Sequence, residues 1–106
     1  MWLFLNNRKR NLIMDDKNTF YIKLKAQLED TTEFPAEYMF KFIVPAAENQ
    51  VKEVHELFNN KGAVIKTKKS KTGKYISLSI VLKIENADKV IEYYKSAENI
   101  KGIISL

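Results

Sequence analysis

The segment from Tyr75 to Ile84, YISLSIVLKI, alternates between aliphatic and other residues more regularly than any other part of the chain. Successive side chains of a β-strand point to opposite faces of a sheet, so the aliphatic set would share one face. A stripe of this length predicts a strand in the middle of a sheet with one face on the core. The aliphatic positions are Ile76, Leu78, Ile80, Leu82 and Ile84.

Three further strands are predicted around this one. Residues 37–44 (EYMFKFIV) are rich in aromatic and branched residues and lie between two prolines. Residues 62–69 (GAVIKTKK) lead through a turn at SKTG into the alternating strand, and residues 99–106 (NIKGIISL) close the chain. The inward positions of the first strand are Tyr38, Phe40, Phe42 and Val44.

Three amphipathic helices are predicted between or before the strands. The first runs over residues 19–30 behind an Asn18 cap, with Phe20, Leu24 and Leu28 on one stripe. The second covers residues 46–62, and the third covers residues 87–97 behind an Asn86 cap. The inward stripes are Ala47, Val51, Val54 and Phe58 in the second helix, and Ala87, Val90, Ile91 and Tyr94 in the third.

This order, a leading helix followed by βαββαβ, predicts an α+β fold. Right-handed crossovers place the two later helices on one face of a four-stranded antiparallel sheet. The result is a ferredoxin-like plait in which the third strand is central and the lysine-rich second strand lies at an edge. A chain of 106 residues is one domain, and residues 14–106 are expected to form it.

The charge of the chain is unevenly distributed. The net charge is +5, and Arg8, Lys9 and Arg10 in residues 1–13 are not offset by any acid there. Residues 61–84 hold seven lysines and no acid, which leaves the rest of the domain acidic. Residues 1–13 lack the order of a signal peptide, and no segment is long enough to span a membrane. We expect a disordered tail or a mis-assigned start before Met14, and a cytoplasmic protein.

Nothing in the sequence assembles a catalytic or metal site. The chain has no cysteine, and its one histidine, His55, lies between Glu53 and Glu56 on a helix, where loose pairing with a glutamate is expected. The three glycines stand at element ends rather than in a phosphate-binding loop. The sequence therefore predicts no enzyme activity, no metal and no cofactor.

The lysine cluster before the central strand is the candidate binding surface. It could contact an acidic protein partner or nucleic acid phosphates, or it could only keep an edge strand soluble. RNA-binding domains of this topology carry several aromatics on the third strand, whereas KYISLSIV has one, so nucleic acid is not favoured. The uneven charge is also compatible with a homodimer in which this hairpin contacts the acidic remainder of a second copy. The candidate partner-binding residues are Lys66, Lys68, Lys69, Lys71, Lys74 and Tyr75.

Two stretches resemble a known family. FPAEYMFKFIVP (residues 34–45) and the pattern of Ser70, Gly73, Tyr75 and Ser77, both in one βαββαβ frame, look like the small YbeD-like bacterial family of unknown function. The resemblance implies a fold similar to ACT-type regulatory domains, which bind amino acids and related effectors near the first strand and helix. Here that loop reads VPAAENQV without a glycine, so no ligand residues are assigned from it.

The sequence thus predicts a regulatory or protein-interaction domain without catalytic activity, which binds an acidic partner or acts as an ACT-like module. Two alternatives stay open. One is a small-metabolite-binding regulatory domain with its site between the first strand and the following helix. The other is nucleic-acid binding through the lysine-rich hairpin.

Overall fold

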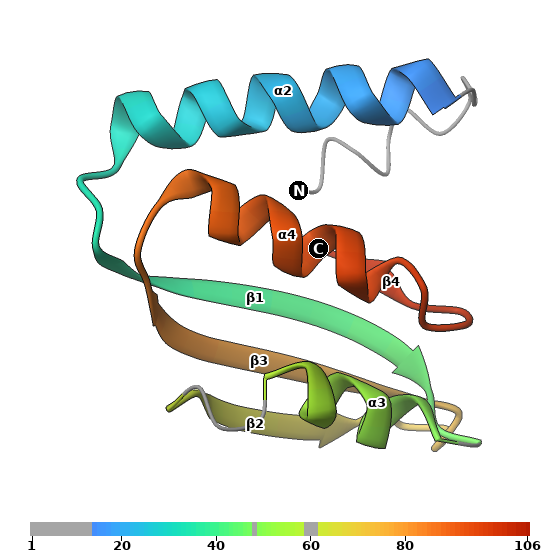
Figure 1. Cartoon of the computed structure of the whole chain (residues 1–106). Helices are drawn as coiled ribbons and strands as arrows, with labels where there is room; N and C mark the ends of the chain where they lie inside the picture. Colours follow the sequence, from blue (N-terminus) through green and yellow to red (C-terminus); the bar gives the residue numbers. More distant parts are fainter. Residues whose placement is uncertain (1–13, 48, 59–61) are drawn as a thin grey trace.

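The computed structural model describes residues 14–47, 49–58 and 62–106. Residues 1–13, where a tail or a mis-assigned start was expected, lie outside these ranges. The predicted order of a leading helix followed by βαββαβ is confirmed (Figure 1). The elements are α2 (Met14–Thr31), β1 (Ala36–Pro45), α3 (Gln50–Leu57), β2 (Val64–Lys69), β3 (Tyr75–Ile84), α4 (Ala87–Ala97) and β4 (Ile104–Ser105).

The four strands form one antiparallel sheet in the order β2-β3-β1-β4. β3 is doubly paired, as its alternation predicted: it pairs with β1 over its whole length and with β2 from Ile76 to Val81, while β1 is the second inner strand. The lysine-rich β2 lies at one edge, also as predicted, and β4 pairs with β1 at only two positions. This is the topology of the ferredoxin-like plait, so the predicted fold class is confirmed.

The even-numbered side chains of β1 and β3 form the sheet's contribution to the core. Phe40, Phe42 and Ile80 are completely buried. α3 and α4 cover this face, and the ring of Phe40 lies 5.2 Å from that of Phe58 and 5.1 Å from that of Tyr94, centroid to centroid. Aromatic pairs in this range add about 1 kcal/mol each beyond the area they bury. Phe40 therefore ties the sheet to both helices.

α2 packs mainly on α4, antiparallel to it (Figure 1). Two ion pairs fix this direction: Lys25 Nζ lies 2.9 Å from Asp88 Oδ1 at one end, and Lys17 Nζ lies 3.4 Å from Glu98 Oε1 at the other. Tyr21 and Leu28 are the buried side chains of α2. The predicted stripe of Phe20, Leu24 and Leu28 included Leu28 but omitted Tyr21.

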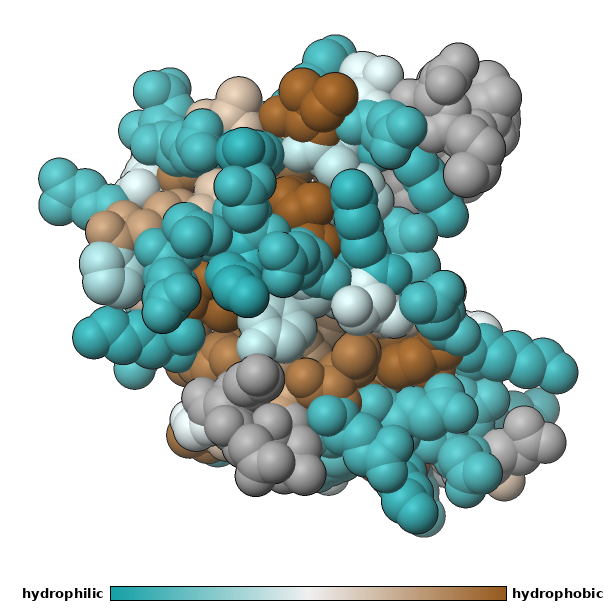
Figure 2. Space-filling view, in the orientation of Figure 1, coloured by the Kyte–Doolittle hydropathy of each residue, from teal (hydrophilic) through white to brown (hydrophobic). Residues whose placement is uncertain are grey.

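Figure 2 shows that the surface over α2 and α4 is mostly hydrophilic, while hydrophobic surface gathers in a band between α4 and α3. None of the helices in the described ranges is long and apolar enough to cross a membrane.

Two predicted helix starts are wrong. α2 begins at Met14 rather than after Asn18, because an asparagine inside a helix is only a few tenths of a kcal/mol less favourable than average. α3 begins at Gln50 rather than at Ala46, and Ala47, which was placed on its inward stripe, is exposed. The Ala46 N–H donates to the Lys74 carbonyl at 2.9 Å, so the sheet ladder still holds the backbone at this point. By contrast, α4 and its Asn86 cap are found where the sequence predicts them.

Candidate binding surface

The turn between β2 and β3 is organised around Ser70. The Ser70 N–H donates to the Tyr75 carbonyl at 2.9 Å, and the Tyr75 N–H donates to Ser70 Oγ at 3.1 Å. The Gly73 N–H donates to the Ser70 carbonyl at 3.0 Å, and Gly73 has a φ of +78°, where glycine is unstrained. Ser70, Gly73 and Tyr75, three of the four residues in the family-like pattern, therefore shape the hairpin. This leaves the Tyr75 ring available for contacts, because only its backbone is used.

No helix or strand of the described residues covers the face of the sheet opposite α3 and α4, called the open face below. Strand pairing places on it the odd-numbered residues of β1 and β3 together with the even-numbered residues of β2. These residues form cross-strand rows that alternate in character. The rows are Glu37–Lys83, then Met39–Val81–Val64, then Lys41–Ser79–Lys66, then Ile43–Ser77–Lys68, and finally Pro45–Tyr75.

The apolar members of the open face are unusually accessible. Val64 is 58% exposed, Met39 53% and Tyr75 47%. Ile104, which pairs with Ile43 at the other edge, is also exposed. Exposed apolar side chains that recur across neighbouring strands, rather than singly, are typical of a contact surface.

The structure divides the predicted partner-binding residues into three groups. Lys66, Lys68 and Tyr75 lie on the open face. Lys69 pairs with Ile76 and therefore belongs to the opposite face, although it is exposed at the sheet edge. Lys71 and Lys74 lie in the exposed turn. The cluster is thus one strand plus its turn, with side chains on both sides of the sheet plane.

Sequence reasoning missed Lys41 on β1. Ser79 of β3 lies opposite both Lys41 and Lys66, so these two lysines flank the same position from either side, about 10 Å apart at the usual strand spacing. Lys83 is exposed on the same face, opposite Glu37. The alternation of β1 could have revealed Lys41, because it stands between Phe40 and Phe42, two inward positions.

The lysines of the open face are not neutralised within the described ranges. The ion pairs there join Lys17 to Glu98, Lys25 to Asp88 and Lys89 to Glu92, all on the helical side. Lys41 and Lys66, about 10 Å apart at the usual strand spacing, are separated by slightly more than the Debye length of about 8 Å at physiological ionic strength, so salt screens much of their mutual repulsion. The part of the open face that holds Lys41, Lys66 and Lys68 is therefore basic, with apolar side chains beside the charges, and Glu37 lies farther along the same face, opposite Lys83.

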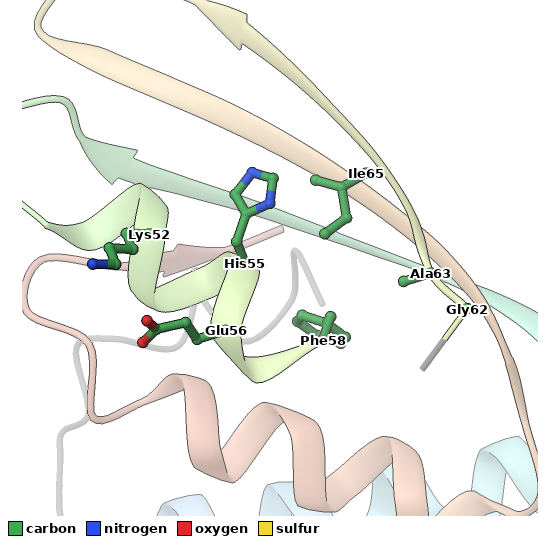
Figure 3. A pocket seen from close by; sticks show the side chains of 7 residues that line it. All are labelled: Lys52, His55, Glu56, Phe58, Gly62, Ala63 and Ile65. Carbon is green, nitrogen blue, oxygen red and sulfur yellow. The ribbon is translucent and has the colours of Figure 1, made fainter. Parts of the chain in front are cut away.

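A cavity of about 310 Å³ lies between α3 and the start of β2 (Figure 3). Phe58 and Ala63 contribute apolar surface to it, and Ile65 of β2 faces His55 of α3 across it. Lys52, Glu56 and Gly62 complete its rim. His55 is exposed and forms no ion pair with a glutamate in the described part of the chain, so the loose pairing expected from the sequence is not seen.

A second cavity, of about 580 Å³, opens at the start of α3. It is lined by Asn49, Gln50, Glu53, Asn99 and Lys101. Gln50 is only 6% exposed, and its Oε1 has no hydrogen-bond partner among the described residues. Asn49 stands at the N-cap position without a side-chain bond to the helix. A buried, unpaired amide oxygen is unusual in a folded protein, and no pattern in the sequence indicates it.

The described residues contain no group of three or more histidine, aspartate or glutamate side chains placed to hold a metal ion. The side chains of the open face beside β2 are mainly lysines, serine hydroxyls and apolar groups. This set of groups is suited to binding by charge and contact.

These features define a ferredoxin-like α+β domain with helices on one sheet face and a basic, partly apolar open face. Residues 29–105 match the family described as "Protein of unknown function (DUF493)", and the chain belongs to this family. The resemblance to the YbeD-like family noted from the sequence is thereby confirmed.

The fold is shared with two solution structures of protein HP0495 from Helicobacter pylori. The first has a TM-score of 0.58 at 18% identity and covers 72% of this chain and 86% of that one. The second, described as a hypothetical protein, has a TM-score of 0.54 at 16% identity and covers 69% of this chain and 87% of that one. No curated protein matches the chain. At these identities the likeness concerns the fold alone.

Proposed function

We propose that this domain is a non-catalytic binding module that captures an acidic protein partner through the β2–β3 hairpin and the open face beside it. The observation that carries the proposal is the placement of Lys66 and Lys68 beside Lys41 on an open face, without an ion pair in the described ranges. The exposed apolar residues Met39 and Val64 add contact area to the charge. A protein surface satisfies both groups of residues, whereas a nucleic acid backbone uses only the lysines.

A charge reversal tests this proposal. The double variant Lys66→Glu/Lys68→Glu reverses the two open-face charges of β2, and Lys23→Glu/Lys89→Glu changes the net charge equally at exposed positions on the helical side. Affinity capture from the native host, quantified by mass spectrometry, should lose partners with the first variant and keep them with the second. Because both side chains are exposed, the melting temperature should change little. Retention of every partner by the first variant would refute the proposal.

A gel shift with single- and double-stranded nucleic acid at low and moderate salt distinguishes nucleic-acid binding from binding of a protein partner. Binding that falls steeply with salt and depends on Lys66 and Lys68 would favour nucleic acid over a protein partner.

A second candidate function is small-metabolite binding at the start of α3. Its support is Gln50, whose unpaired amide lines the second cavity together with Lys101. A ligand with a donor group would satisfy Gln50 Oε1, and its anionic end would be stabilised by Lys101. Thermal-shift screening of amino acids and small anions tests this idea, with Lys101→Ala as the matched variant. A stabilising ligand should lose its effect in that variant, and the absence of any stabilising compound would count against the site.

A further inference from the structure

The outer edge of β2 carries unpaired backbone groups. Ser70 and Tyr75 form a hydrogen-bonded pair, so the ladder register assigns the even-numbered residues of β2 to bonding with β3. The N–H and C=O groups of Ile65, Thr67 and Lys69 then point outward, away from the sheet. β2 is the end strand, and none of the described residues supplies a partner for these groups. Three donors and three acceptors are therefore presented in a row.

The cavity between α3 and β2 lies next to this edge on the helical side. Ile65 pairs with Ile80, so its side chain is on the helical face and forms one wall of the cavity. A strand added beside β2 would also direct alternate side chains to this face. One of them would lie next to Ile65 and over Phe58, at the mouth of the cavity (Figure 3).

The charges around the β2 edge favour an added strand that is negatively charged. Lys66 and Lys68 flank it on the open face, and Lys71 and Lys74 lie at its turn end. Residues 61–84 contain no acid that could offset them. A second copy that paired β2 with β2 would place these lysines opposite one another, and like charges directly across a ladder are destabilising. The edge is complementary to an acidic segment and opposes self-pairing.

We propose that the β2 edge is the docking site for an extended acidic segment of a partner protein, which adds to the sheet as a fifth strand. Its acidic side chains face Lys66 and Lys68, and the apolar side chain that lies opposite Ile65, next to the acid facing Lys66, enters the cavity. Main-chain bonding of this kind gives affinity, and the alternate pockets give specificity. The inference rests on the proposed function, since it specifies how the acidic partner is held.

The test uses the full chain and a fluorescently labelled heptapeptide in which glutamates alternate with valine, leucine and valine. Two further peptides carry backbone N-methyl groups, one on the glutamates and the other on the apolar residues. In an added strand only one of these sets donates to β2. We expect the parent peptide to bind in a fluorescence anisotropy titration. One methylated peptide should lose affinity by about tenfold or more, because two or more main-chain bonds of about 1 kcal/mol are removed.

A variant of the protein provides the reciprocal measurement. Thr67→Pro removes an outward N–H but no bond to β3, and proline is tolerated on edge strands in this position. It should weaken peptide binding by about fivefold or more, whereas Thr67→Val, which keeps the N–H, should bind as the parent chain does. Circular dichroism checks that Thr67→Pro is folded. If it is not, the methylated peptides still test the proposal on the unmodified protein.

Replacement of the central leucine of the peptide by alanine tests the cavity. The leucine-to-alanine peptide should bind the parent chain about tenfold more weakly than the original peptide. The difference between the two peptides should be smaller for the variant Ala63→Leu, whose larger side chain occupies the same space.

Three results would overturn strand addition. Failure of the parent peptide to bind is the first, and equal binding of all three peptides is the second. In both cases partner capture that still depends on Lys66 and Lys68 would leave the proposed function standing. The third is a concentration-dependent dimer that Thr67→Pro abolishes, because the edge would then be filled by a second copy.

Discussion

At residue 73 the backbone conformation permits glycine and little else. The φ of +78° lies in the left-handed region, and a Cβ built there would meet only Lys69 Cδ, at an ordinary 3.9 Å. The penalty of a side chain is therefore conformational, and Gly73→Ala should lower the free energy of unfolding by about 1–2 kcal/mol. Gly73→Asn should lose less, because asparagine tolerates this region. Urea denaturation of both variants measures the difference, and equal losses would indicate crowding instead.

Two buried tyrosines should make the protein sensitive to alkali. Burial raises the pKa of Tyr94 far above 10.0, and its hydrogen bond with Tyr38 contributes further. Burial and the hydrogen bond to Glu98 raise the pKa of Tyr21 in the same direction. Below the pKa of an unfolded tyrosine, about 10, both states are protonated and stability is intact. Above it the unfolded chain ionises first, so stability falls as pH rises.

The variant Tyr94→Phe isolates one of these groups. Tyr94 alone contributes a slope of up to about 1.4 kcal/mol per pH unit above pH 10. The variant should therefore be less stable by about 1 kcal/mol at neutral pH, where the bond to Tyr38 is lost, but should show a shallower alkaline decline. Unfolding free energies at several pH values around 10 give both quantities. Parallel curves for the two proteins would contradict the assignment to Tyr94.

Two asparagines stand at helix N-caps, but only one caps its helix. Asn86 Oδ1 accepts from the Lys89 N–H at 2.9 Å, whereas Asn49 makes no side-chain bond to α3. Asn86→Ala should therefore lower the free energy of unfolding by about 1 kcal/mol, and Asn49→Ala should change it little. Asn86→Ser should recover most of the loss. Thermal or urea denaturation checks all three, and similar losses from both alanine variants would be the contrary result.

These elements also show what the sequence could predict. The cap of α4 and the alternation of β3 depend on neighbours within a few residues, and both were predicted correctly. The start of α3 depends on the bond from Ala46 to Lys74, which no local pattern reveals. The placement of Lys41 and Lys66 on either side of Ser79 depends on the registers of two strand pairs at once. The lysine cluster was visible in the sequence. Its division between the two faces of the sheet, and the cavity between α3 and β2, could be found only in the tertiary structure.

In the molecule as a whole, the layers follow one another from the basic open face of the sheet, through the sheet and α3 and α4, to α2 on the outside. The open face of the sheet is basic, the opposite face is covered by α3 and α4, and α2 forms an outer layer that buries only Tyr21 and Leu28 among its described side chains and adds two surface ion pairs. Such pairs contribute little in water, usually less than 1 kcal/mol. Residues before 29 also lie outside the region that matches the family. α2 is therefore expected to open separately while the βαββαβ unit stays folded.

Native-state hydrogen exchange can distinguish the separate opening of α2 from unfolding of the whole domain, because a variant in the sheet core should affect only the second. Ile80→Val destabilises the sheet core by about 1 kcal/mol, which should speed the slowest β1 and β3 amides about fivefold. If α2 opens while the sheet stays folded, its own amides should not respond. Leu28→Ala, on the buried side of α2, should speed both groups, because α2 is unfolded in both open states. Ile22→Ala, at a position 69% exposed on the same helix, should speed neither. Faster exchange of the α2 amides in Ile80→Val would show that helix and sheet unfold as one unit.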